Sequence, residues 1–149
     1  MACVLNALRE LNFSKVGCIS LIDNAPVITV DDPRRDGWVY CWVEAPRDAA
    51  PHVLYVGMAG KTLRKRMKEH EGGFKRSATG RAHAEDLRRI LSQGGTVEVW
   101  ARKSETVEVL GRHVCAASVE EAALIEILQP HRNSETKMAK RERKISDHG

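Results

Sequence analysis

The sequence predicts an α+β domain in which helices pack against a small sheet. Short runs rich in β-branched and aromatic residues alternate with longer amphipathic segments, in the order β-β-α-α-β-α. Turns that contain proline or glycine separate these segments. The chain has 149 residues, which suits one domain and is enough to bury a core without cross-links. A second catalytic domain does not fit this length.

Three strands are expected. The loop 31–37 precedes a first strand at 38–44, and the segment 46–51, which begins and ends with proline, separates it from a second at 52–57. Such a short connection favours an antiparallel pair. A third strand is expected at 96–102, where apolar and polar residues alternate.

Helices are expected at 63–71 and 82–92, because each segment has helical periodicity and is followed by a pair of glycines. The intervening segment 75–81 is polar, basic and glycine-containing. It is expected to be a connecting loop, either solvated or in contact with a phosphate backbone, and the basic helices on either side favour the contact.

A further helix is predicted to begin at Ser118, where Glu121 three residues later completes a capping-box pattern, and to end before Pro130. Nearer the N-terminus, residues 2–11 resemble a short helix. Residues 15–30 mix β-branched residues with a proline and an Asp-Asn turn, so this segment is expected to be irregular or weakly stranded.

The charge distribution favours a polyanionic partner. The net charge of +4 and the pI near 9.0 favour such a partner only modestly, because many other soluble proteins share them. The distribution is more informative, since residues 61–89 contain ten Lys or Arg and four Asp or Glu. The candidate nucleic-acid contacts are Lys61, Arg64, Lys65, Lys75, Arg76 and Arg81. Residues 137–144 are also basic, and a solvated tail explains them equally well.

The four cysteines lie far apart, with no CxxC pair and no histidine at metal-ligand spacing. Neither a zinc site nor a disulfide framework is therefore expected, and reduced thiols in a cytoplasmic protein are the simple interpretation. The sequence also has no long uncharged stretch of the kind that spans a membrane. Trp38, Trp42 and Trp100 could stack on bases, but tryptophans in strands more often belong to the core.

The helix at 63–71 carries a mixed stripe. Leu63, Arg66, Met67 and His70 fall at the spacing that normally faces a core, yet two of the four are polar. An amphipathic helix with a snorkelling arginine explains this spacing as well as a site does. In the functional interpretation, Arg66 and His70 face a bound phosphate and the guanidinium neutralises charge on its oxygens.

The last helix has an apolar face formed by Leu124, Ile125, Ile127 and Leu128. Glu121 projects toward this face and lies closer to its centre than Glu120. A carboxylate among apolar residues needs compensation, and a divalent cation supplies it, so Glu121 is the preferred metal ligand. The alternative is that both acids occupy the first turn because they favour the helix dipole.

In order along the chain, the motifs resemble those of the GIY-YIG nuclease superfamily. The residues that carry the resemblance are Trp38-Val39-Tyr40, Tyr55-Val56-Gly57, the helix with Arg66 and His70, and Glu121 followed by Pro130-His131-Arg132-Asn133. It covers about residues 37–133. The step of twelve residues from Glu121 to Asn133 is like the family's and selects Glu121 over Glu120.

The resemblance implies a central three-stranded antiparallel sheet flanked by helices, and one Mg²⁺ or Mn²⁺ held mainly by Glu121. It implies that Tyr40 is the general base or orients the nucleophile and that Tyr55 positions the phosphate or shares this task. Arg66 would stabilise the transition state, His70 would assist proton transfer or hold a phosphate oxygen, and Asn133 would order the site. A free phenol is a poor base at neutral pH, so nearby cations must favour phenolate.

The sequence therefore predicts a metal-dependent DNA endonuclease with residues 1–36 as an N-terminal extension, 37–133 as the nuclease domain and 134–149 as a basic tail. RNA is not excluded as a substrate. Concerted cleavage of both DNA strands would favour a homodimer, because each chain has one site. The alternative is a nucleic-acid-binding module that keeps the fold without catalysis, and the complete set of catalytic residue types makes this less favoured.

Overall fold

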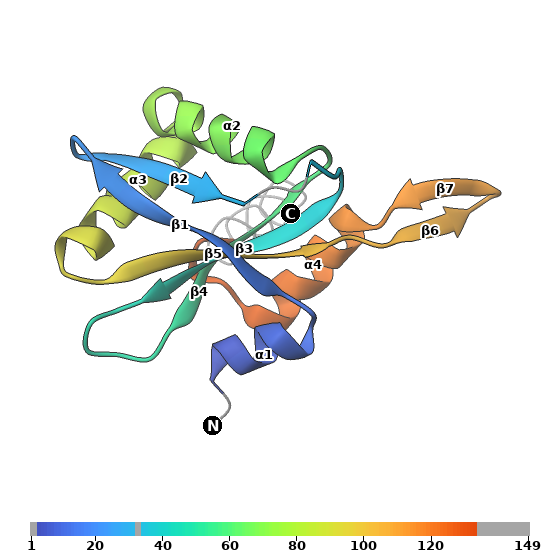
Figure 1. The fold of residues 1–149 in the computed structure, drawn as a ribbon, viewed down its shortest axis with the longest axis horizontal. Coiled ribbons are helices and arrows are strands. Elements are labelled where there is room, and N and C mark those ends of the chain that lie inside the picture. Colours follow the sequence, from blue (N-terminus) through green and yellow to red (C-terminus); the bar gives the residue numbers. More distant parts are fainter. Residues whose placement is uncertain (1–2, 32–33, 134–149) are drawn as a thin grey trace, which may run out of the picture.

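A five-stranded antiparallel sheet forms the centre of the molecule (Figure 1). The computed structural model describes residues 3–31 and 34–133, so the expected basic tail at 134–149 lies outside the described residues. The strand order is β2-β1-β5-β3-β4. The strands are β1 (Ser14–Ile22), β2 (Ala25–Val30), β3 (Trp38–Ala45), β4 (His52–Ala59) and β5 (Thr96–Lys103).

Helices cover both faces of this sheet, and β3 is buried on both sides. Tyr40 and Trp42 of β3 pack toward α2 (Leu63–Arg76) and α3 (Ala78–Ser92). The alternate residues of β3 pack toward α1 (Val4–Glu10) and α4 (Ala117–Leu128). Burial on both faces explains why the sequence of β3 is almost continuously apolar rather than alternating.

The three expected strands are present as β3, β4 and β5, but the sheet has five strands rather than three. The additional strands come from residues 15–30, where the stranded alternative is confirmed and the irregular one is wrong. Asp23 and Asn24 both have positive φ, as a type I′ hairpin turn requires, and they join Ile22 to its partner Ala25. Pro26 is tolerated because β2 is an edge strand. The region before residue 37 thus contributes to the same sheet as the expected nuclease domain.

The two long helices also differ from expectation. α2 continues through Gly72 and Gly73 to Arg76, and α3 begins at Ala78, so residues 75–81 do not form a loop. Gly72 and Gly73 therefore do not end the helix, and the glycine that close packing requires is Gly80. A β-carbon on Gly80 would lie 2.0 Å from the carbonyl oxygen of Gly73, so only glycine permits this approach. Ser77 makes the junction, because its hydroxyl accepts a hydrogen bond from the Gly80 amide at 2.9 Å.

α4 begins one residue before the expected position, and Ser118 is not its cap. Ala116 occupies the N-cap position, and its methyl side chain cannot accept a hydrogen bond; its backbone amide donates to the Glu105 carbonyl across the preceding hairpin at 2.9 Å. The C-terminal end agrees with expectation, since Gln129 adopts the left-handed conformation and Pro130 follows. Ile127 is 62% exposed, so it lies outside the buried face, which is narrower than predicted.

A second, two-stranded sheet was not expected. β6 (Thr106–Val109) and β7 (Arg112–Cys115) form a hairpin that projects from the body of the molecule (Figure 1). Leu110 and Gly111 at its tip both have positive φ, which again fits a two-residue turn. Within residues 3–31 and 34–133, no helix has the length and apolar character needed to cross a bilayer.

Candidate active site

The two motif tyrosines meet on the sheet face that packs against α2 and α3. Tyr40 of β3 pairs with Gly57 of β4, and Tyr55 lies two residues before Gly57 on the same face. The rings of Tyr40 and Tyr55 are 6.2 Å apart between centroids. Tyr40 is fully buried, whereas Tyr55 is partly exposed.

α2 places its polar stripe residues against these rings. Leu63 and Met67 are buried and fix the helix on the sheet, and Arg66 and His70 are half-buried on the same side. Thr62 caps the helix by accepting a hydrogen bond from the Lys65 amide at 3.2 Å. The burial of the apolar pair therefore determines where the guanidinium and the imidazole are presented.

His70 links the two tyrosines. Its Nε2 atom and the Tyr40 hydroxyl are hydrogen-bonded at 2.5 Å, and its ring stands edge-on to Tyr55 with centroids 5.5 Å apart. The guanidinium of Arg66 lies close enough to act electrostatically on both phenols, and it also pairs with Glu69 at 3.1 Å. Tyr40, Tyr55, Arg66 and His70 thus form one cluster.

The surroundings of this cluster keep its two phenols and its imidazole neutral in the free protein, while Arg66 remains charged. Burial raises the pKa of Tyr40 well above its ordinary value and the neighbouring Tyr55 adds to this, while Arg66 opposes it. Burial likewise raises the pKa of Tyr55, and here Arg66 again opposes the shift. Burial lowers the pKa of His70 to about 3, helped by the positive charge of Arg66. At neutral pH both phenols are therefore protonated and His70 is uncharged.

The two glutamates at the start of α4 have different surroundings. The carboxylate of Glu120 pairs with Arg102 at 3.3 Å. Glu121 is half-buried, and its negative charge contributes to the raised pKa of Tyr55, which places it within electrostatic range of the tyrosine cluster. Of the two, Glu121 is therefore the carboxylate that acts electrostatically on Tyr55.

Asn133 binds the edge strand beside Tyr55. Its side-chain amide donates to the Val56 carbonyl at 2.8 Å, and its side-chain oxygen accepts from the Val56 amide at 2.7 Å. Within residues 3–31 and 34–133, no strand pairs with β4 on this side, so the two bonds satisfy backbone groups that another strand would otherwise pair. The contact fixes the backbone next to Tyr55 without placing the Asn133 amide on a tyrosine.

The side chains that could bind a metal near the tyrosines fit Mg²⁺ better than Zn²⁺. Among the described residues, no three His, Cys, Asp or Glu side chains cluster in a way that could hold an ion. This does not match a zinc site, which takes three or four protein ligands. Mg²⁺ commonly takes one or two carboxylates, with water and substrate phosphate completing the shell, so a half-buried Glu121 is compatible with it.

The expected nucleic-acid contacts are all exposed and lie toward the two ends of α2. Arg64 and Lys65 line a cavity of about 330 Å³ together with Arg34, Thr62 and Lys68. Lys61 lies just before this end of the helix, while Lys75 and Arg76 occupy the last turn of α2 and Arg81 the first turn of α3. The three tryptophans are buried, as a core role predicts and base stacking does not.

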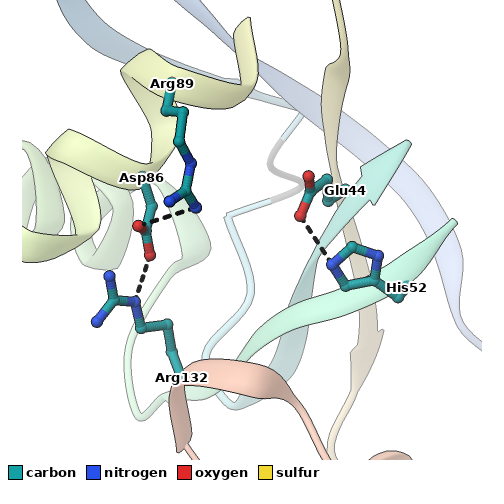
Figure 2. Close-up of polar contacts among 5 residues, drawn as sticks. All are labelled: Glu44, His52, Asp86, Arg89 and Arg132. Atoms are coloured by element: carbon teal, nitrogen blue, oxygen red, sulfur yellow. Dashed lines mark hydrogen bonds and ion pairs between the residues drawn. The ribbon is translucent and has the colours of Figure 1, made fainter. Parts of the chain in front are cut away.

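Two buried polar residues near the cluster were not among the predicted site residues. His83 of α3 stands edge-on to Tyr55, with centroids 5.0 Å apart, and Asp86 one turn later binds Arg132 and Arg89 (Figure 2). Burial lowers the pKa of His83, and Arg132 adds to the effect. Both residues interrupt the apolar stripe of α3, the same signal that singled out Arg66 and His70 on α2.

No family model matches the sequence, and no curated protein matches it either. The solved structures that share the fold include the following two. A mutant of bacteriophage T4 EndoII has a TM-score of 0.66 and 18% identity, covering 87% of this chain and 97% of that one. The restriction endonuclease Hpy188I in complex with product DNA has a TM-score of 0.51 and 15% identity, covering 83% and 77%. The chain therefore has a fold that is also found in nucleases.

Proposed function

We propose that this protein is a divalent-metal-dependent endonuclease that hydrolyses DNA phosphodiester bonds at a single active site of the GIY-YIG type. The observation that carries the proposal is the hydrogen bond between Tyr40 and His70, with Tyr55 and the guanidinium of Arg66 beside it. Packing of a hydrophobic core does not require a cation, two phenols and an uncharged imidazole at one place. In phosphoryl transfer, by contrast, such groups stabilise charge on the phosphate, position it and move a proton.

Arg66 stabilises the charge that develops on the phosphate. Its guanidinium is half-buried on a helix that is anchored by Leu63 and Met67, so little reorganisation is needed when a phosphate arrives. A planar guanidinium also matches two phosphate oxygens at once, which a lysine cannot do.

Tyr40 and His70 act as a pair in moving a proton. With its proton on Nδ1, neutral His70 can accept the Tyr40 proton at Nε2 over the 2.5 Å contact. Tyr40 can then take a proton from the attacking water, so the buried phenol acts as a relay and is not required to ionise alone. A bound phosphate supplies negative charge that offsets the effect of Arg66 on the pKa of His70. Tyr55, the more exposed phenol, positions the phosphate.

Glu121 is the residue that would hold the metal. Mg²⁺ or Mn²⁺ bound there would polarise the phosphate and favour deprotonation of the nucleophile. Glu121 comes from the opposite face of the sheet to Arg66 and His70, so the site forms where both helical layers reach the β4 edge. Asn133 holds that edge in place.

DNA is the proposed substrate because one structure of the same fold is a restriction endonuclease with product DNA. The surface chemistry agrees, since basic side chains stand at both ends of the helix that carries Arg66 and His70. These ends are about 20 Å apart for a 14-residue helix, a span over which a duplex presents several phosphates.

A plasmid nicking assay with Mg²⁺, Mn²⁺ or EDTA tests the proposal. The wild-type protein should convert supercoiled DNA to nicked or linear forms only when metal is present. Glu121→Gln should lose at least about 100-fold in rate, because the carboxylate that would hold the metal is gone. Glu120→Gln is the matched control, since Glu120 precedes Glu121 in α4 but binds Arg102, and its rate should stay within about twofold.

Absence of metal-dependent cleavage of any DNA or RNA substrate would contradict the proposal, as would full activity in Glu121→Gln. The alternative, a binding module without catalysis, predicts salt-dependent DNA binding that survives Tyr40→Phe and Arg66→Ala, with no cleavage in either metal. Running the assay on single-stranded RNA in parallel separates a DNA enzyme from an RNA enzyme.

A further inference from the structure

Asp86 carries an ion pair that joins two separate parts of the fold. Its side chain is 8% exposed and contacts Arg89 at 3.2 Å and the Nε atom of Arg132 (Figure 2). Arg89 lies three residues away on the same helix and is largely exposed. Arg132 lies 46 residues away, in the segment after α4. The contact with Arg132 is therefore the one that ties α3 to another element.

This contact spans the free edge of the sheet. In the part of the chain that the structure describes, β4 pairs with β3 and with no second strand, and α3 and α4 cover opposite faces. The chain leaving α4 crosses this edge, where Asn133 makes its two hydrogen bonds to the backbone of Val56. Asp86 holds the neighbouring Arg132 from the α3 face. The edge strand is thus bonded to a segment that is itself anchored on α3.

The same face of α3 also contacts Tyr55 directly. His83 lies one turn before Asp86, is 7% exposed, and packs its ring against the ring of Tyr55 at 5.0 Å between centroids. α3 therefore holds the Tyr55 side chain through His83. Through Asp86 and Arg132 it holds the segment that bonds to Val56, the residue next to Tyr55.

We propose that Asp86 is a positioning residue for the active site. By anchoring Arg132, it keeps the segment after α4 closed over β4, and this fixes Tyr55 from one side of the sheet and the Glu121 helix from the other. The inference rests on the proposed function, because a positioning role has meaning only if Tyr55 and Glu121 serve one reaction. Displacing a catalytic group by about 1 Å can cost about 100-fold in rate.

Asp86→Asn is the test variant, because it keeps the shape of the side chain and removes its charge. We expect kcat for DNA cleavage to fall about 10- to 100-fold while KM stays within about twofold, since phosphate binding is kept but alignment is lost. Asp86→Glu, which restores the carboxylate, should recover part of the rate. Glu44→Gln is the matched control, and its kcat should stay near that of the wild type. It removes the ion pair of Glu44 with His52 at 2.7 Å, which lies at the end of β3 and β4 remote from Asp86 (Figure 2).

Hydrogen exchange of the Val56 amide, measured by NMR, gives a readout that does not depend on cleavage. The amide donates to Asn133, so Asp86→Asn should speed its exchange by about tenfold or more, while amides of β1 stay protected. If Asp86→Asn does not fold, Arg132→Lys is the second test variant. Lysine keeps the positive charge but has no Nε donor for the bond to Asp86.

A folded Asp86→Asn protein with wild-type kcat, or with unchanged exchange at Val56, would overturn the positioning role. A merely structural role would lower overall stability without changing kcat per folded molecule. If the wild-type protein cleaves no nucleic acid, the proposed function fails. The exchange at Val56 then still shows whether Asp86 closes the segment over β4, and protection that is unchanged in the variant overturns that claim too.

Discussion

A β-carbon at position 57 would lie 2.3 Å from the hydroxyl oxygen of Tyr40, because Gly57 pairs with Tyr40 across the two strands. It would also lie 2.9 Å from the Tyr55 ring. Tyr40 of the motif Trp38-Val39-Tyr40 thus requires a glycine at position 57 of the motif Tyr55-Val56-Gly57. The two motifs are parts of one packing arrangement. The reason is space and not backbone conformation.

Gly57→Ala should therefore damage the site and the core together. We expect it to lower the free energy of unfolding by about 1–3 kcal/mol through overpacking. The rate of DNA cleavage should fall about 100-fold, because the Tyr40 hydroxyl must move away from His70. Gly60→Ala is the matched control, since a β-carbon there meets no atom within 4 Å. Denaturant unfolding and the nicking assay measure both effects, and equal behaviour of the two variants would contradict the packing argument.

The stability of the protein should fall in mild acid because of His70. Its pKa is about 3 in the folded protein and near 6.5 in the unfolded chain, so between these values the unfolded state binds the additional proton. The free energy of unfolding should therefore decrease as pH falls below 6.5. By pH 4 the loss from His70 should be about 3 kcal/mol, at about 1.4 kcal/mol for each pH unit.

Urea unfolding of the wild type and of His70→Gln at pH 7 and pH 4 measures this contribution. The difference between the two pH values should shrink in His70→Gln, although the lowered pKa of His83 keeps part of it. His113→Gln is the control, since His113 is exposed in the projecting hairpin. An unchanged pH dependence in His70→Gln would show that His70 is not held neutral.

Asn133→Asp should separate the two bonds that Asn133 makes to Val56. A carboxylate can still accept from the Val56 amide, but it cannot donate to the Val56 carbonyl and is placed against it. We expect a loss of about 1–3 kcal/mol in the free energy of unfolding and a clear fall in kcat. The loss of stability should be smaller at low pH, where the aspartic acid is protonated and can donate. A loss that does not depend on pH would contradict this.

Both basic ends of α2 should contribute to DNA affinity. In a Glu121→Gln background that prevents cleavage, Arg64→Ala with Lys65→Ala, and Lys75→Ala with Arg76→Ala, should each weaken binding about tenfold at low salt. Each pair should also reduce the slope of log affinity against log salt by up to about 2. Lys15→Gln on β1, where Lys15 pairs with Glu98 at 2.8 Å, should change neither quantity. Fluorescence anisotropy at several salt concentrations gives both.

The parts of the fold that were predictable are those where local signals and tertiary packing agree. The strands β3, β4 and β5 have clear turn signals at their ends, and α2 has a stripe whose apolar members are buried. The hairpin β1–β2 was predicted only as one of two alternatives, because Pro26 argues against a strand until the strand is known to lie at the sheet edge. The glycines at 72 and 73 indicated a helix end, whereas α2 continues past them to Arg76. The close approach of Gly80 to the Gly73 carbonyl is a contact between two helices, so local sequence does not reveal it.

The candidate site likewise contains residues that local spacing could predict and residues that depend on partners far away in the sequence. The spacing of Arg66 and His70 within one helix indicated that they share a face, and the structure places both beside the two tyrosines. His83 interrupts the apolar stripe of α3, but this signal does not identify its partner Tyr55, which is 28 residues earlier in the chain. The same is true of Asp86, since its partner Arg132 comes from a segment on the far side of β4.

Tyr40 and Tyr55 are the only two tyrosines in the chain, and both lie in the candidate site. Every tyrosinate absorption change that the folded protein shows is therefore a report from this site, with no background from other phenols. Since the pKa values of both groups are raised, the phenolate band should stay absent until above pH 10 in the folded protein. The appearance of that band at lower pH on adding metal or DNA would be an optical signal of ligand binding that needs no label.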